Sequence, residues 1–270
     1  MKAHYLLAGA LLAAAVCAPA WAAPGKATDP ILTNHGRKSP CGELHNAFGP
    51  WDYREGNIDN RVNIVLSVHF PAEVENNERG ARGSLGADMD YTLRALPNYI
   101  PALLAMARQA KKERTLQPAG AHYPVECYFE RAMRFQPKDA AVRTAYANWL
   151  REQGRDNDAR AMYLAAVELT PGNAAANYNV GLLYYRAKDY EKANLYAHRA
   201  YALGFPLPAL KNLLVKEGKW ADVTDEQLDL PDNAKKAAAE AAEATSDAAA
   251  PGTSAKGDTP AASGPAPALA

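Results

Sequence analysis

The side chains that could do chemistry in this sequence are few and widely spread. The candidate acids, bases, nucleophiles and metal ligands are His45, His69, His122, His198, Asp52, Asp88, Asp90, Cys41 and Cys127. A histidine beside an aspartate can act in general acid–base catalysis, and cysteine with histidine at short spacing can hold zinc. The chain contains neither H-E-x-x-H nor G-x-S-x-G, and it has no paired cysteine–histidine zinc spacing. We therefore predict that the protein is not an enzyme and has no cofactor or metal site. The alternative is an enzyme with a site at His69, Asp88 and Asp90 in the N-terminal block.

The N-terminus has the features of a secretory signal peptide. Lys2 is followed by the apolar run Leu6 to Val16 and by Ala20-Trp21-Ala22, an A-x-A cleavage signal. We expect residues 1–22 to be removed near Ala22 and the product to be periplasmic, with no transmembrane segment in the mature chain. Cys17 follows a poor lipobox, so we expect it to leave with the signal peptide. Lipidation of Cys17 would instead indicate a pilotin-like assembly lipoprotein.

Export changes the meaning of Cys41 and Cys127. In an oxidising compartment these two cysteines could form a disulfide that ties the N-terminal block to a later helix. Two separate buried thiols explain the sequence equally well, and both alternatives stay open. Neither cysteine has a C-x-x-C neighbour, so a reactive thiol is the weakest interpretation.

The elements around these residues are organised by a repeat. Pro137 and Pro171 stand 34 positions apart, and small and aromatic residues recur with that period. The first copy has Tyr146, Ala147, Leu150, Ala159, Tyr163 and Ala166, and the second has Val180, Gly181, Tyr184, Ala193, Ala197 and Ala200. Residues three, four and seven apart share one helix face, so each copy predicts two antiparallel helices that approach closely at alanine and glycine. The pattern resembles the tetratricopeptide repeat (TPR), whose units stack into an α-solenoid.

The repeat extends in both directions in divergent form. Pro97 and Pro137 are 40 positions apart, and the turn-rich stretch from Leu116 to Pro124 can absorb the additional six residues. Pro208 to Trp220 predicts a capping helix that stops at Gly218. The expected fold is all-α, with about three TPR units and a cap over residues 97–220.

The N-terminal block, residues 41–96, is expected to be small and mostly irregular or helical. Residues 62–70 alternate like a strand, but no partner strand is evident, so a helix with Ile58, Val62, Val65 and His69 on one face is the alternative. Pro71 predicts the start of a helix that ends by Gly80. Gly80, Gly83 and Gly86 predict a mobile connector, and Asp88 is expected to cap the next helix.

Composition sets the remaining limits. The 30 basic and 30 acidic residues balance, so the chain as a whole has no general attraction for nucleic acid or membrane. Residues 23–40 are expected to be a flexible arm and residues 221–270, rich in alanine and proline, a disordered tail. The block from Gly49 to Asn98 joined to the repeats resembles uncharacterised exported bacterial TPR proteins, which adds architecture but no chemistry.

The TPR resemblance also implies a binding surface. The first helix of each repeat would line a concave face that holds an extended peptide or a partner helix. Carried over to this chain, that face presents Leu104, Arg108, Lys111, Lys112, Thr144, Asn148, Arg151, Glu152, Tyr178, Asn179, Leu182, Tyr185 and Arg186. Asn148 and Asn179 match two asparagines of a carboxylate clamp, but Thr144 replaces its lysine. We therefore expect a scaffold that binds a protein or peptide partner of acidic character, and no nucleic acid.

Overall fold

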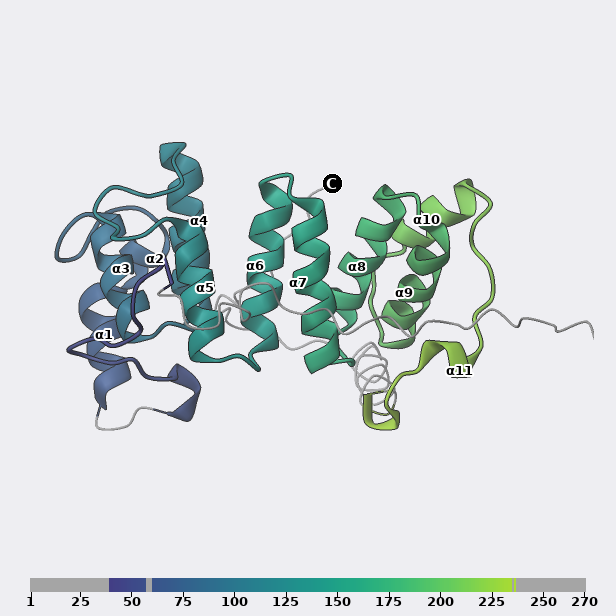
Figure 1. Ribbon diagram of the computed structural model, residues 1–270, viewed down its shortest axis with the longest axis horizontal. Helices are drawn as coiled ribbons and strands as arrows, with labels where there is room; N and C mark the ends of the chain where they lie inside the picture. Colours follow the sequence, from purple (N-terminus) through teal and green to yellow (C-terminus); the bar gives the residue numbers. More distant parts are fainter. Residues whose placement is uncertain (1–38, 57–59, 235, 237–270) are drawn as a thin grey trace, which may run out of the picture.

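The computed structural model describes residues 39–56, 60–234 and 236, and all regular structure within these ranges is helical. Figure 1 shows the helices in one elongated row, with the N-terminal block at one end and α10 and α11 at the other. The elements in chain order are η1 (Tyr53–Glu55), α1 (Arg61–His69), α2 (Ala72–Glu75), α3 (Leu85–Ala95), α4 (Ile100–Glu113), α5 (Val125–Phe135), α6 (Ala140–Glu152), α7 (Asp156–Leu169), α8 (Ala174–Arg186), α9 (Tyr190–Ala202), α10 (Ala209–Lys216) and α11 (Asp225–Leu228). The expected all-α fold is confirmed.

The alternating segment 62–70 forms helix α1. Val62 and Val65 are buried, whereas Ile64 is 45 % exposed, as a helical period requires and a strand period does not. The strand interpretation is therefore wrong, because the neighbouring described segments offer no strand to pair with, and the helical alternative holds. Ile58 of the predicted face lies outside the described residues.

The glycine-rich connector before α3 is held in place by Asp88. Ser84 caps α3 by accepting a hydrogen bond from Ala87 N, so the expectation that Asp88 is the cap is wrong. Asp88 lies inside the helix, and its Oδ2 accepts hydrogen bonds from the backbone N–H groups of Ala81, Arg82 and Gly83. The connector is thus folded around a buried carboxylate.

Gly86 explains part of the glycine spacing. A Cβ atom at this position would overlap the carbonyl oxygen of Ala119, so the residue is small because the loop after α4 crosses α3 here. The prediction of a mobile connector missed both this close approach and the hydrogen bonds to Asp88.

The two predicted hairpins are present and repeat with the period read from the sequence. Helices α6 and α8 begin at Ala140 and Ala174, and helices α7 and α9 begin at Asp156 and Tyr190, so each pair is offset by 34 residues. The residues before α6 and α8, Asp139 and Asn173, both cap their helices with side-chain oxygens. The same short sequence pattern therefore occurs in both copies and specifies where the helices of both hairpins begin.

Small residues occupy the crossing points inside the hairpins. Ala159, Ala193 and Ala197 are fully buried, and a Cβ atom at Gly181 of α8 would overlap Leu210 of α10 and crowd the backbone of α9. Tyr163 is also fully buried and fills a wider gap. These positions agree with those predicted from the repeat.

Helices α4 and α5 form the divergent first hairpin, joined by residues 114–124. The chain reverses at Arg114, which adopts a left-handed conformation at the end of α4. Val125 N donates to Leu116 O at 2.8 Å, and Gln117 Nε2 donates to Ala121 O at 2.9 Å, so the long loop has hydrogen bonds of its own.

The C-terminal end of the row is closed by α10 and by the segment after it. Leu210 and Leu214 of α10 are fully buried against the last hairpin, as a capping helix requires. Residues 221–234 then return along α9, where Leu228 and Leu230 are buried with Leu203. Ordered packing therefore continues beyond residue 221, where the tail was predicted to begin. None of the helices described has the length and apolarity needed to cross a bilayer.

Candidate partner-binding surface

The predicted binding face begins on α4, where two of its cations contact the N-terminal block. Arg108 Nη2 donates to Glu75 O at 2.6 Å, and Lys112 Nζ donates to Asn77 O at 3.0 Å. Asn77 itself is buried and donates to Ala105 O. The acceptors of both cations are neutral carbonyls, so these bonds fix the side chains without cancelling their charge.

Two further predicted residues form exposed ion pairs. Lys111 Nζ lies 3.3 Å from Glu152 Oε2, and Arg186 Nη1 lies 3.5 Å from Asp156 Oδ2. The Lys111 and Glu152 side chains are 71 % and 50 % exposed. Pairs of this kind contribute about 0–1 kcal/mol, so both cations can exchange their partner for a ligand carboxylate at small cost.

On α6 the predicted residues divide between internal and accessible positions. Thr144 Oγ1 donates to Ala140 O, and the Asn148 carbonyl oxygen accepts from Tyr163 OH, which ties α6 to α7. Arg151 is half-buried, and its side chain makes no hydrogen bond or ion pair with any described residue; the same holds for Asn179 on α8. The asparagine clamp is thus weaker than expected, because one of its amides is already engaged.

The aromatic end of the predicted face is covered by the cap. Tyr178 is 7 % exposed and stacks on Phe205 with ring centroids 4.1 Å apart. The prediction that Tyr178 contacts a partner is therefore wrong, because packing against the cap buries its side chain. Leu182 and Tyr185 are half-buried in the same cluster, and Tyr185 OH lies 3.4 Å from Glu217. The open part of the face therefore lies over α4 and α6, with Asn179 and Arg186 at its border.

A pocket of about 350 Å³ lies at this open part, between the C-terminal ends of α4 and α6. Ala107 and Ala110 of α4 and Trp149 of α6 supply its apolar lining, and the loop residue Leu116 forms one wall. The polar lining residues are Lys111, Arg114, Thr115, Glu152 and Gln153. Of these residues, the repeat pattern pointed to Lys111 and Glu152 and not to the others, because the rest of the pocket depends on a loop that the pattern does not specify.

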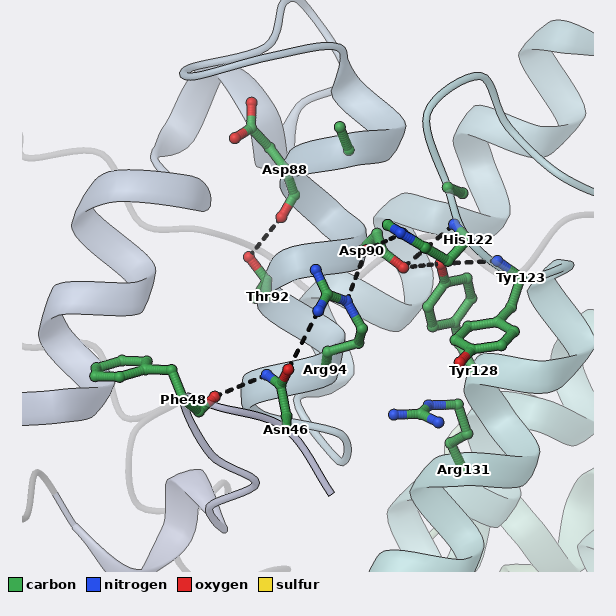
Figure 2. A network of polar contacts seen from close by, with 12 residues as sticks. Asn46, Phe48, Asp88, Asp90, Thr92, Arg94, His122, Tyr123, Tyr128 and Arg131 are labelled. Atoms are coloured by element: carbon green, nitrogen blue, oxygen red, sulfur yellow. Dashed lines mark hydrogen bonds and ion pairs between the residues drawn. The ribbon is translucent and has the colours of Figure 1, made fainter. Parts of the chain in front are cut away.

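The candidate acid–base residues of the N-terminal block form a separate polar network (Figure 2). Asp90 is 1 % exposed and accepts hydrogen bonds from Arg94 Nε at 2.8 Å, from Tyr128 OH and from the backbone N–H of His122. His122 Nδ1 lies 2.7 Å from Asp90 Oδ2. His122 and Tyr128 were not predicted as partners, since they are distant in sequence and no motif links them to Asp90.

A second buried carboxylate, Asp88, is paired with His69. The ring Nδ1 of His69 lies 2.9 Å from Asp88 Oδ1, and the ring stacks on Tyr91. Burial alone would raise the pKa of Asp88, but the backbone N–H groups of residues 81–83 and the His69 ring together lower it below its ordinary value. Burial, with the nearby charge of Asp90, also raises the pKa of Tyr128. Both features keep Asp88 ionised and Tyr128 protonated, which suits structural hydrogen bonding.

The structure joins Cys41 and Cys127 in a disulfide between the N-terminal block and α5. The same chain segment is held by two arginines of α5. Arg131 is 1 % exposed and donates to Cys41 O and Glu43 O, and Arg134 donates to Gly42 O at 2.7 Å. His45 and His198 lie outside both networks; His198 stacks on Trp220 near the cap. In the described part of the chain, no group of three or more candidate ligands is placed to hold a metal ion.

The successive antiparallel hairpins with a capping helix define a helical-repeat protein. Residues 147–188 match the family model described as TPR repeat, so this span of the chain is a TPR repeat. Two solved structures resemble it at low similarity: the MamA protein, with 14 % identity and a TM-score of 0.44, and pilF of Pseudomonas aeruginosa, with 19 % identity and a TM-score of 0.42. Each alignment covers 72 % of this chain, and they cover 98 % and 90 % of the other chains. A search of curated proteins found no match.

Proposed function

We propose that this protein is a scaffold that holds a segment of a partner protein along the first-helix face of α4 and α6, without bond-making chemistry. The observation that carries the proposal is the contrast between the two ends of that face. At the cap, Tyr178 and its neighbours are packed internally, whereas over α4 and α6 the cations are exposed and a pocket is open. TPR units bind proteins or peptides through such faces.

The absence of catalysis is supported by the state of the two acid–base pairs. The Asp88 carboxylate has four donors and Asp90 also has four, so their binding capacity is used within the protein. A general base needs an accessible lone pair beside a substrate. The carboxylates instead hold the connector and the first hairpin in position.

An exported, periplasmic location is part of the same proposal. The Cys41–Cys127 disulfide supports it, because disulfides persist in oxidising compartments and are rare in reducing ones. The signal peptide predicted for residues 1–22, the cleavage site near Ala22 and residues 23–38 of the predicted arm 23–40 lie outside the described residues. Mass spectrometry of the protein isolated from its native cell tests the location: a mature N-terminus near Ala23 supports it, and an intact residue 1 contradicts it.

Peptide display tests the binding function. Random peptides selected against the full chain should bind in a manner that depends on the first-helix face, and the double variant Arg151→Ala with Asn179→Ala should weaken binding about tenfold. The control is Glu168→Ala, an exposed residue on the second helix α7. If no peptide is selected, or if the control weakens binding as much as the double variant, the proposed function is wrong.

A further inference from the structure

The long loop between α4 and α5 presents a large apolar side chain to solvent on a fixed backbone. Leu116 is 64 % exposed, more than any other large hydrophobic residue among those described. Its carbonyl accepts from Val125 N at 2.8 Å, and Ala119 N donates to Glu113 Oε2 at 2.8 Å. Before the exposed leucine, Thr115 N donates to Ala110 O at 3.0 Å, and after it Pro118 and Ala121 are buried, so the loop is anchored on both sides of Leu116. A fixed, exposed leucine is suited to contact an apolar group of another molecule.

The surroundings of Leu116 specify the chemistry of that molecule. The pocket beside it is small, about 350 Å³, and its apolar lining consists of Leu116, Trp149, Ala107 and Ala110. This volume is at the lower end of the range for ligand sites, which suits one large side chain. Trp149 is itself 7 % exposed and stacks on Tyr146, so packing holds this part of the pocket lining in place.

The charges around the pocket favour an anionic ligand. Lys111 and Arg114 are exposed at its rim, and the Arg114 side chain makes no hydrogen bond or ion pair with a described residue. Among the described residues, the opposing carboxylate, Glu152, pairs with Lys111 alone, and this pair is exposed. Arg108 and Lys112, on the same helix, donate to oxygen atoms of uncharged groups and keep their positive charge. Glu113, which ends α4, adds a second carboxylate, so the four cations of residues 108–114 outnumber the carboxylates of Glu113 and Glu152, and the net charge at this end of α4 is positive.

We infer that this pocket, formed by the α4–α5 loop and the C-terminal ends of α4 and α6, anchors one phenylalanine-sized apolar side chain of an acidic protein segment. The apolar side chain enters between Leu116 and Trp149, and flanking carboxylates pair with Lys111 and Arg114. This inference rests on the proposed binding function and adds the anchor and the character of the partner segment to it. It assigns a role to the loop that lengthens the first repeat.

Fluorescence anisotropy with defined peptides tests the inference on the full chain. The probe is a labelled peptide of glutamate and aspartate with one central phenylalanine, and the comparison peptides carry serine in place of phenylalanine or lysine in place of the acidic residues. We expect the probe to bind about tenfold more tightly than either comparison peptide, with affinity falling as salt rises. Leu116→Ser should weaken the affinity for the probe about tenfold. Arg114→Gln should weaken that affinity less and reduce its dependence on salt.

Val215→Ser is the matched control, because Val215 is 55 % exposed on α10 at the far end of the row. It should leave probe binding unchanged. Circular dichroism of all variants checks that they fold. If the probe binds but Leu116→Ser has no more effect than Val215→Ser, the inference is wrong while the scaffold function stands. If neither these peptides nor displayed random peptides bind, both fail. Equal binding of the serine peptide would show charge attraction alone and would also overturn the anchor pocket.

Discussion

Replacing Gly181 by leucine should destabilise the protein through the junction of the last hairpin and its cap. A Cβ added to Gly181 would lie 2.7 Å from Leu210 Cδ2, 3.3 Å from Ala193 O and 3.4 Å from Ala197 N. Leu210, Ala193 and Ala197 are fully buried, so a larger side chain has no direction in which to escape. Overpacking of this kind costs about 1–3 kcal/mol.

Alanine at position 181 separates the gain in helix propensity from the cost of overpacking. Gly181→Ala gains about 1 kcal/mol of helix propensity and introduces a single contact below 3 Å, with the flexible end of Leu210. We therefore expect Gly181→Ala to stay within about 1 kcal/mol of the parent and Gly181→Leu to lose about 1–3 kcal/mol.

Urea unfolding followed by circular dichroism measures both variants. The control is Ala175→Leu, since Ala175 is exposed on the same helix and its replacement should change the free energy of unfolding by less than about 0.5 kcal/mol. If Gly181→Leu is as stable as Ala175→Leu, the packing of α8 against α9 and α10 is not as described, and the reasoning is refuted.

Three further changes test the other junctions. Cys127→Ser removes a link that spans 86 residues and should lower the free energy of unfolding by about 4–5 kcal/mol on the chain-entropy model, which urea unfolding without reductant measures; an unchanged midpoint would contradict the disulfide. The hydrogen bond from Arg54 lowers the pKa of Asp52 from 3.8 to about 2, so this contribution to stability is complete above about pH 5 and is lost as the pH falls towards 2. Asp52→Asn should remove that pH dependence from acid unfolding curves, and identical curves for the variant and the parent would argue against it. Leu228→Ser should abolish hydrogen-exchange protection in residues 221–234 and leave α6 protected, whereas unchanged protection would show that the segment does not depend on this contact.

The helices that could be predicted from the sequence are those specified by neighbouring residues in a pattern that recurs along the chain. The hairpins α6–α7 and α8–α9 follow from small residues, aromatic residues and prolines that recur after 34 positions, and helices begin at corresponding residues in both copies. The capping helix was found for a similar reason, since its leucines keep a helical spacing and Gly218 follows them.

The features that were missed depend on contacts between distant residues. Asp88 has the residue type of a helix cap, but its actual partners are the connector and His69, which only the folded chain brings to it. Leu228 and Leu230 lie in an acidic stretch that looks solvent-exposed, yet they are buried because α9 leaves an apolar surface beside Leu203. Tyr178 carries a binding position by repeat equivalence, but the cap covers it.

The candidate site shows the same division. Repeat equivalence located Lys111, Arg151 and Asn179 on the accessible face, because helix register follows from the local pattern. The pocket between Leu116 and Trp149 could not be predicted, since it is formed by a loop whose length departs from the repeat and whose path is set by Gly86 and Ala119. The deviation from the family pattern is therefore where this chain gains a surface of its own.

Site-specific photo-crosslinking in the native cell tests the central claim that the first-helix face binds a partner protein. A photoreactive phenylalanine analogue is placed at Asn179 or Arg151 on that face, and at Glu168 or Glu191 on the second helices as controls. The scaffold model predicts that a discrete protein is crosslinked from the first-helix positions and not from the second-helix positions. Crosslinks of equal yield from both sets, or crosslinks from the second-helix positions alone, would contradict it.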